Sequence, residues 1–431
     1  MNNWQLHENA LLDERYYSAT HASGLPLVVF PKKLSTTYAL LAVNYGSVDN
    51  MNADGEAAFP HGIAHFLEHK LFANEDGSDS FERFSAFGAD ANAYTAYNRT
   101  VYLFSCTDRF KESLAELIDF VTHPYFTAQS VEKEQGIIAE EIRMCLDDPY
   151  ERCYHNMITA LYQCHPVREE ICGSERSVMA ITAEMLQAAY DAHYTLPNMM
   201  LIVCGNVTPD EVWDIANARL PKAPGVKPAR VKLPQEPAEV CTQHATVRGN
   251  VAKPIFSIGI KDSCPTGNPR EMVLRDVTMD LLNEMLFSDT GELYNSLYDR
   301  NLISPVFGAS YSRTRGFGHF HLSGEADDPE LVFDEILRYL ERVAREGLCR
   351  EEFERARRIL FADYIKAFDS TEEIAETLLS FAIEGADIFQ YPEIVQGADF
   401  DMAQQIVREL FVKERIVLSV VRPLDEQEDT V

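Results

Sequence analysis

The sequence predicts an α+β protein built from two homologous halves, each a mostly antiparallel sheet with helices packed on one face. The chain has 431 residues, which is long for a single hydrophobic core and favours at least two domains. Prolines concentrate near its middle, and similar helical patterns recur on both sides of them. Short apolar runs, clearest at 27–30 and 201–204, predict strands that mix with amphipathic helices, as is typical of the α+β class.

The boundary between the halves is predicted from a proline-rich segment at 221–238. Its prolines are Pro221, Pro224, Pro228, Pro234 and Pro237. Proline at this density interrupts both helix and sheet and leaves a semi-rigid connector. We therefore expect a first half at 1–220, a linker at 221–238 and a second half at 239–431.

An internal repeat relates the two halves. The segment 131–142 aligns without a gap on 353–364, and the upstream segment 117–121 resembles 336–340. Such self-similarity indicates a duplicated structural unit. In the second copy Ala356 stands where the first copy has Glu134, and the second half contains no His-x-x-Glu-His. We predict that the second half keeps the fold but binds no metal.

The most informative motif of the first half is His65-x-x-Glu68-His69. On a helix, residues three and four apart share a face, so the two imidazoles and the carboxylate point the same way. Two imidazoles at this spacing can bind one Zn²⁺, and the carboxylate beside them can accept a proton from water. This inverted form of the zinc protease motif indicates metal-assisted hydrolysis of a peptide bond.

The alternative interpretation of this motif is a surface helix with two solvated histidines. The neighbouring residues are apolar, namely Ile63, Ala64, Phe66, Leu67, Leu71 and Phe72. The helix is therefore expected to be buried, where its polar groups need partners that a metal can supply. His61 also lies four residues before His65, but it follows Pro60 where the helix is expected to start. We place His61 at the helix N-terminus or at the rim of a pocket, not among the ligands.

A third ligand is expected from another helix, because a catalytic zinc usually has three protein ligands. The segment 130–143 predicts that helix, since its apolar positions recur at helical spacing. Glu134 and Glu141 are the carboxylates best placed to turn inward, whereas Glu132 and Glu140 are expected to face solvent. Cys145 follows on the inward face and is expected to be a small core residue.

These motifs resemble the pitrilysin/insulinase family of zinc peptidases, which includes the mitochondrial processing peptidases. The matching segments are 62–69, 87–95 and 134–141. The resemblance implies that His65, His69 and Glu141 bind one Zn²⁺ per chain and that Glu68 is the general base. It implies that Glu134 orients a ligand histidine, as carboxylates behind metal ligands commonly do.

The same resemblance implies how a substrate is held. In the family the strand that matches Asn92, Ala93, Tyr94 and Thr95 is an exposed edge beside the metal. An extended peptide adds to it as one more strand, so that backbone hydrogen bonds supply affinity. The family architecture is a clamshell, in which the two halves close over a peptide chamber.

One part of the family pattern is altered in this chain. The family usually carries, in its second half, an Arg and then a Tyr that stabilise the charge developing on the scissile carbonyl. The corresponding stretch, 295–306, has a displaced Arg300, and Ser304 or Pro305 stands where the Tyr is expected. Local substitutes are Tyr298 with Arg300, or Tyr311 with Arg313. We favour a second explanation, in which a zinc-free paralogue supplies the pair within a heterodimer.

The sequence therefore predicts a zinc-dependent endopeptidase that cleaves short or unstructured peptides held as an added strand beside the metal. The alternative is a non-catalytic assembly or peptide-binding subunit of a family heterodimer. The net charge of −30 disfavours nucleic acid as a partner. No signal peptide or membrane span is evident, and nine scattered cysteines without a C-x-x-C pair are typical of reduced thiols, so we expect a cytoplasmic protein.

Overall fold

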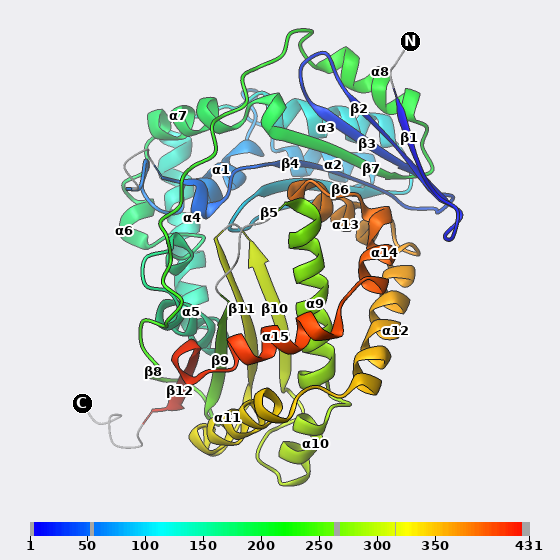
Figure 1. Ribbon diagram of the computed structural model, residues 1–431. Helices are drawn as coiled ribbons and strands as arrows, with labels where there is room; N and C mark the ends of the chain where they lie inside the picture. The colour runs from blue at the N-terminus through cyan, green and yellow to red at the C-terminus, as the bar shows by residue number, and fades with distance from the viewer. Residues whose placement is uncertain (1–3, 52–55, 263–267, 315, 425–431) are drawn as a thin grey trace, which may run out of the picture. The chain divides into compact units, whose positions relative to one another are not determined.

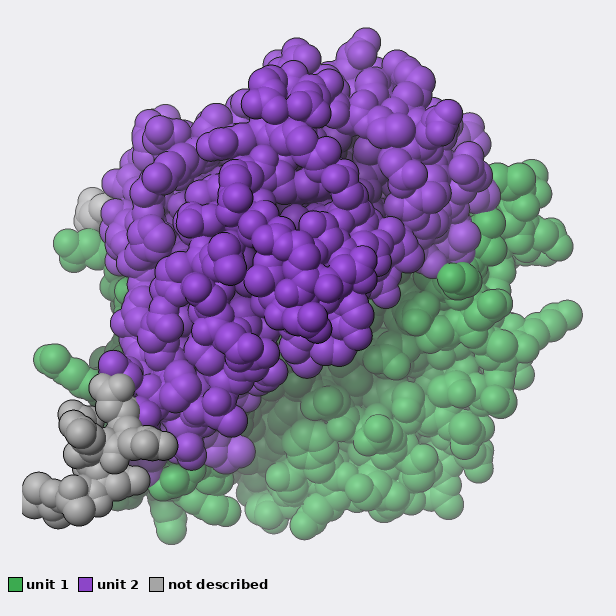
Figure 2. Space-filling view, turned by 90° about the horizontal axis from the view of Figure 1, so that it is seen from below, with its two compact units in different colours: residues 1–142, 169–232, 364–389 green, residues 143–168, 233–363, 390–431 purple. Residues whose placement is uncertain are grey.

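A computed structural model describes residues 4–51, 56–262, 268–314 and 316–424 (Figure 1). The chain divides into two compact units, which Figure 2 distinguishes by colour. Unit 1 contains residues 1–142, 169–232 and 364–389, and unit 2 contains residues 143–168, 233–363 and 390–431. Each unit is thus assembled from segments of both sequence halves.

Unit 1 is built on a seven-stranded sheet with the order β1-β2-β3-β7-β4-β6-β5. The strands are β1 (Gln5–Asn9), β2 (Glu14–Thr20), β3 (Pro26–Pro31), β4 (Thr37–Val43), β5 (Asp90–Thr95), β6 (Thr100–Cys106) and β7 (Met199–Gly205). Neighbouring strands are antiparallel except for the parallel pair β3 and β7. The strands predicted at 27–30 and 201–204 are β3 and β7, which confirms both.

Both faces of this sheet are covered near β4, which is buried along its whole length. Side chains alternate between the two faces of a strand. Ala39, Leu41 and Val43 belong to the core that also contains residues of α1 (Ile63–Leu71) and α3 (Phe110–Thr122). Tyr38, on the other face, donates a hydrogen bond to Glu376 of α13 (Thr371–Glu384). A helix from the second sequence half therefore covers the second face of this sheet, which the sequence did not predict.

Unit 2 contains a five-stranded sheet with the order β10-β11-β9-β12-β8. The strands are β8 (His244–Gly249), β9 (Ile255–Asp262), β10 (Gly308–Thr314), β11 (Phe317–Glu325) and β12 (Ile416–Pro423). The pair β12 and β8 is parallel, and the other pairs are antiparallel. The helix α5 (Pro149–Leu161), from the first sequence half, packs on β9 and β12.

The two sheets confirm the predicted duplication. When the order β3-β7-β4-β6-β5 is laid on β8-β12-β9-β11-β10, the parallel pair falls at the same place in both. The repeated segments also match. Residues 117–121 and 336–340 lie in α3 and α11 (Pro329–Glu346), and residues 131–142 and 353–364 lie in α4 (Ala128–Asp147) and α12 (Arg350–Ala367).

The helices that follow these repeats are exchanged between the units. After α4, the chain enters unit 2, where α5 packs on β9 and β12. After α12, it enters unit 1, where α13 packs on β4 and β7. Because β9 and β12 correspond to β4 and β7, the exchange is symmetric. The compact units therefore follow packing, whereas the division at 1–220 and 239–431 stays a prediction about sequence halves.

The remaining segments complete both units. The other helices are α2 (Ser80–Phe87), α6 (Glu175–Val178), α7 (Ala183–His193), α8 (Pro209–Arg219), α9 (Pro269–Phe287), α10 (Glu292–Asp299), α14 (Tyr391–Gln396) and α15 (Phe400–Leu410). The proline-rich segment 221–238 is described throughout and contains neither helix nor strand. Within the described ranges, no helix combines the length and the apolar composition needed to cross a membrane.

The described cysteines are all free thiols, and Cys264 lies outside the described residues. The expectation that Cys145 belongs to the core is wrong, because its side chain is exposed. The buried face of α4 ends at Ile142, and residues 143–148 are exposed. The prediction from helical spacing continued the buried face of α4 for one turn too many, because the helix contacts the core only as far as Ile142.

Candidate metal centre

The helix α1 carries three of the predicted functional side chains into the interior of unit 1. Its apolar residues Ile63, Phe66 and Leu67 are fully buried, and His65 and Glu68 between them are each 9% exposed. The helix begins immediately after Gly62, which has a φ of +91°. A Cβ atom at this position would lie 2.3 Å from the carbonyl oxygen of Cys172, so only glycine fits.

His61 lies immediately before the N-cap residue of α1, Gly62, which is consistent with one of its two expected placements, the helix N-terminus. It is half-buried, and its side chain does not belong to the group of candidate metal ligands found among the described residues. His61 is thus excluded from the ligand group, as expected.

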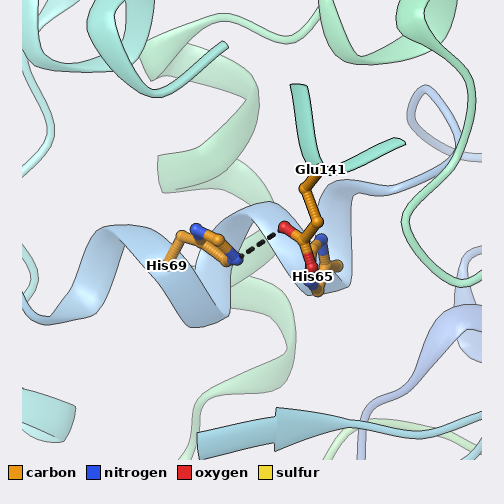
Figure 3. Close-up of side chains that lie close together, drawn as sticks. All are labelled: His65, His69 and Glu141. Carbon is orange, nitrogen blue, oxygen red and sulfur yellow. Dashed lines mark ion pairs between the residues drawn. The ribbon is translucent and has the colours of Figure 1, made fainter. Parts of the chain in front are cut away.

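Glu141 of α4 meets both histidines of α1 (Figure 3). Its Oε1 lies 3.5 Å from His65 Nε2, and its Oε2 lies 3.4 Å from His69 Nε2. One ligand atom from each of these residues lies within 4.8 Å of the other two, and the described part of the chain contains no other such group of three or more. The structure therefore brings together the three residues that the sequence placed on two separate helices.

The distances between these atoms are short enough for the three side chains to share one cation. Zinc binds imidazole nitrogen and carboxylate oxygen at about 2.0–2.2 Å, so tetrahedral angles place neighbouring donors about 3.3–3.6 Å apart. The distances of 3.4 and 3.5 Å fall in this range, and they involve different oxygens of Glu141, Oε2 toward His69 and Oε1 toward His65. They exceed the usual N–H···O hydrogen-bond length of about 2.7–3.2 Å. The spacing therefore suits a shared cation better than two direct hydrogen bonds.

Glu134 contacts the ring nitrogen of His69 that faces away from the ligand group. Its Oε1 lies 3.1 Å from His69 Nδ1. A carboxylate in this position fixes the ring with Nδ1–H as the donor, so that Nε2 keeps a lone pair toward the ligand group. His65 differs, because its buried Nδ1 has no hydrogen-bond partner among the described residues.

The electrostatics of the group favour a positive charge at its centre. Burial alone would lower the pKa of His69, but its bond to Glu134 and the nearby carboxylates of Glu141 and Glu68 raise that pKa to about 10. The adjacent imidazoles of His65 and His69 hold the pKa of Glu141 well below its ordinary value. Burial would raise the pKa of Glu134, yet its bond to His69 lowers it overall. Such carboxylates favour a metal cation as they favour a proton.

Glu68 lies beside the ligand group on α1 but does not belong to it. Its Oε2 accepts a hydrogen bond of 2.6 Å from the hydroxyl of Thr95, the last residue of β5. The sequence predicted Glu68 next to the ligands, but it gave no sign of this partner. The nearest signal was the position of Thr95 at the end of the segment 87–95, which matches the family.

The strand β5 contains all four residues predicted to bind substrate, Asn92, Ala93, Tyr94 and Thr95. It is the last strand of its sheet and pairs with β6 alone in the described structure. Its outer edge can therefore accept a further strand. Two of its side chains are already held by the protein, because Thr95 bonds to Glu68 and Tyr94 bonds to Glu376.

The residues considered as carbonyl stabilisers all lie in unit 2. Tyr298 is 44% exposed on α10, and Arg300 pairs with Glu335 at 2.7 Å. Tyr311 donates to Asp262 at 2.7 Å. The guanidinium of Arg313 binds both carboxylate oxygens of Asp276, and its side chain is 5% exposed. The alternative pair is thus committed to contacts within its own unit.

Two segments of the chain match known protein families. Residues 32–175 match the family described as insulinase, peptidase family M16. Residues 180–360 match the domain described as the peptidase M16 inactive domain. The first matched segment contains His65, His69 and Glu141, and the second contains four of the five strands of the second sheet, β8 to β11, together with β7 of the first sheet.

Individual relatives match over nearly the whole chain. A Bacillus subtilis protein named uncharacterized zinc protease YmfH is 34% identical over 419 residues, which are 96% of this chain and 97% of that protein. The solved structure of a proposed M16-like peptidase from Alicyclobacillus acidocaldarius is 31% identical with a TM-score of 0.89, and the match covers 98% of this chain and 99% of that one. A protease from Helicobacter pylori shares the fold at 18% identity and a TM-score of 0.82, over 95% of this chain and 100% of that one.

Proposed function

The chain belongs to the insulinase family of peptidases, family M16, and on that premise we propose that it is a zinc-dependent endopeptidase of short or unstructured peptides. The observation that carries the proposal is the group formed by His65, His69 and Glu141, whose ligand atoms lie within 4.8 Å of one another. Glu68 lies on the same helix as the two histidines, where it can accept and donate a proton.

We propose that His65, His69 and Glu141 hold one Zn²⁺ per chain. When bound, zinc lowers the pKa of a water molecule from about 15.7 to roughly 7 and polarises a carbonyl. Glu68 accepts the proton that the water loses and passes it to the leaving amine. Glu134 keeps the ring of His69 oriented by its bond to Nδ1. The side chain of Glu141 is 40% exposed, which leaves one side of the group open to a water and a substrate.

The outer edge of β5 is the proposed substrate-binding element. An extended peptide would bond as an added strand to the outward-facing backbone groups within the segment Asn92, Ala93, Tyr94 and Thr95. Only alternate residues of an edge strand turn these groups outward, and the N–H of Ala93 already donates to the side-chain oxygen of Asn92 at 2.9 Å. A folded protein cannot present a free extended strand without local unfolding. This requirement supports short or unstructured peptides as substrates.

We further propose that the stabilisation of the scissile carbonyl requires either Tyr298 with Arg300 or a second subunit. The commitment of Tyr311 and Arg313 to Asp262 and Asp276 argues against that pair. A dimer, and in particular a heterodimer with a zinc-free paralogue, would supply the missing groups. Cleavage that starts only when such a paralogue is added would favour the heterodimer, and cleavage by the chain alone would favour Tyr298 with Arg300. A cytoplasmic location stays a prediction from the sequence.

The alternative, a non-catalytic peptide-binding or assembly subunit, is separated from the peptidase by one experiment. The purified chain is analysed for zinc and incubated with quenched fluorescent peptides, with and without a chelator. We expect about one zinc per chain and cleavage that the chelator abolishes. Glu68→Gln should keep its zinc and lose about 10²–10⁴-fold in kcat, whereas Glu132→Gln, an exposed glutamate of α4, should match the wild type. Full activity of the Glu68→Gln variant, or peptide binding without products in the wild type, would overturn the proposal.

A further inference from the structure

The contact between Thr95 and Glu68 joins the edge strand to the proposed base. The distance of 2.6 Å between Thr95 Oγ1 and Glu68 Oε2 is that of a hydroxyl bound to an ionised carboxylate. An ionised carboxylate can only accept, so the hydroxyl of Thr95 is the donor. The two residues lie on different elements, β5 and α1, and the bond fixes one carboxylate oxygen against the strand.

The surroundings of Thr95 leave its hydroxyl proton to Glu68. Thr95 pairs across the sheet with Thr100, and their hydroxyl oxygens are 3.5 Å apart. Thr100 is fully buried and donates its own proton to the carbonyl oxygen of Tyr45 at 2.9 Å. A hydrogen bond between the two threonines would therefore need Thr95 as its donor. Thr95 has a single hydroxyl proton, and that proton already lies in the much shorter bond to Glu68. The β-branched side chain of threonine also restricts χ1, which limits the positions of the hydroxyl.

We propose that Thr95 is a positioning residue, which holds one oxygen of Glu68 so that the other is presented to the ligand group. This inference rests on the proposed function, in which Glu68 moves protons. The terminal torsion of a glutamate is broad, so a carboxylate without such a partner rotates between several orientations. A carboxylate that is already held in one orientation does not have to give up this rotational freedom in each turnover. Thr95 was first expected to bind substrate, but the structure commits its side chain to the base and leaves only its backbone for a peptide.

Thr95 contributes to two elements of the proposed site, one through its backbone and one through its side chain. The backbone of Thr95 belongs to the edge along which the peptide would align, and its side chain holds the base. Thr95 thus links the strand that is proposed to bind the peptide to the carboxylate that is proposed to move protons.

The test removes the hydroxyl without changing the shape of the side chain. In Thr95→Val we expect kcat to fall about 10- to 100-fold, which is part of the contribution of a general base, with unchanged zinc content and a KM within about twofold. Thr95→Ser keeps the donor and should recover most of the lost kcat. Thr37→Val, the same change at a buried position of β4 in the same sheet, is the matched control and should leave both constants unchanged. A wild-type kcat in Thr95→Val, or an equal loss in Thr95→Val and Thr95→Ser, would overturn the inference.

A measurement without turnover separates this inference from the proposed function. In the zinc-free protein, the urea midpoints of Thr95→Val, Glu68→Ala and the double variant form a double-mutant cycle, because alanine removes the acceptor of the Thr95 hydroxyl. A direct bond predicts that the two effects are not additive, and additive midpoints would overturn it. If the wild type binds zinc and cleaves no peptide, the proposed function fails, while the cycle still decides whether Thr95 holds Glu68.

Discussion

Tyr94 on the edge strand β5 donates a hydrogen bond of 2.7 Å to Glu376 on α13, although 282 residues separate them in the chain. The other oxygen of Glu376 accepts a bond of 3.2 Å from Tyr38 on β4. A single carboxylate from the second sequence half therefore ties together two strands of the first sheet. With Thr95 bound to Glu68, the strand β5 is anchored through two consecutive side chains, to α13 and to α1.

The first prediction concerns Glu376. In Glu376→Ala, the hydroxyls of Tyr38 and Tyr94 lose a charged acceptor, which should lower the free energy of unfolding by about 1–3 kcal/mol. The looser edge strand should also raise KM severalfold while kcat changes little. Urea unfolding and steady-state cleavage measure the two effects. Glu373→Ala, an exposed glutamate in the same helix, should change neither, and a KM equal in both variants would contradict the anchoring role.

The second prediction concerns metal binding and stability. A ligand that binds only the folded state stabilises it, by about 4 kcal/mol when its free concentration is a thousand times the Kd. We expect zinc to raise the unfolding midpoint of the wild type and a chelator to abolish the gain. Glu141→Ala should show no gain at the same zinc concentration, whereas its exposed neighbour Glu140 can be changed to alanine without loss of the gain. An equal gain in Glu141→Ala would exclude Glu141 as a ligand.

The third prediction concerns Glu134, which holds His69 Nδ1 at 3.1 Å. Loss of a carboxylate behind a ligand histidine typically weakens metal affinity about 10- to 100-fold. Glu134→Gln should therefore retain zinc in excess metal but lose it to a competing chelator at a lower concentration. Competition titration measures the shift. Unchanged affinity together with reduced kcat would show that Glu134 acts elsewhere.

The fourth prediction concerns pH and two histidines of β11. His319 is 1% exposed, and burial lowers its pKa to about 3, while burial lowers the pKa of His321 to about 4. Tyr162 lies 2.9 Å from both the carbonyl oxygen of Gly318 and Nδ1 of His319. Since the carbonyl can only accept, Tyr162 donates to it and accepts from Nδ1–H. The buried Nε2 of His319 then keeps a lone pair without a partner among the described residues.

The sign of the pH effect follows from these pKa values. Below pH 6.5 the unfolded chain protonates His319 and His321 while the folded chain does not, so the contribution of these two histidines to stability falls as the pH drops toward 4. Each histidine contributes a slope of up to about 1.4 kcal/mol per pH unit. For the zinc-free protein, His319→Asn should reduce the slope of the unfolding free energy between pH 6 and about 4. An equal slope in His319→Asn and wild type would contradict the prediction.

The fold class and the two helix faces that form the ligand group could be predicted because their signals are local, whereas the choice of Glu141 over Glu134 as the third ligand came from the family resemblance. The helical spacing of His65, Glu68 and His69 specifies one face of one helix, and the spacing of Glu134 and Glu141 specifies one face of another. The apolar residues around them indicate which faces are buried. The repeat at 131–142 and 353–364 likewise indicated the duplication, because both copies preserve the same pattern.

The contacts that involve Thr95 and Glu376 could not be predicted, because they depend on how distant elements pack. An amphipathic pattern shows that α13 buries one face, but it does not say which sheet receives that face. The error at Cys145 has the same origin. Helical spacing assigned it to the inward face of α4, whereas the core contacts of that helix end at Ile142.

The exchange of α5 and α13 bears on how the protein can be assembled and dismantled. Each sheet has one face covered by a helix from the other sequence half, so a fragment that ends in the proline-rich segment would leave one face of its sheet uncovered and carry one helix with no surface to cover. Neither half is then an autonomous folding unit. A protease that cuts between residues 221 and 238 would produce two polypeptides that remain associated through buried helices, and two separately produced fragments would have to complement each other to fold.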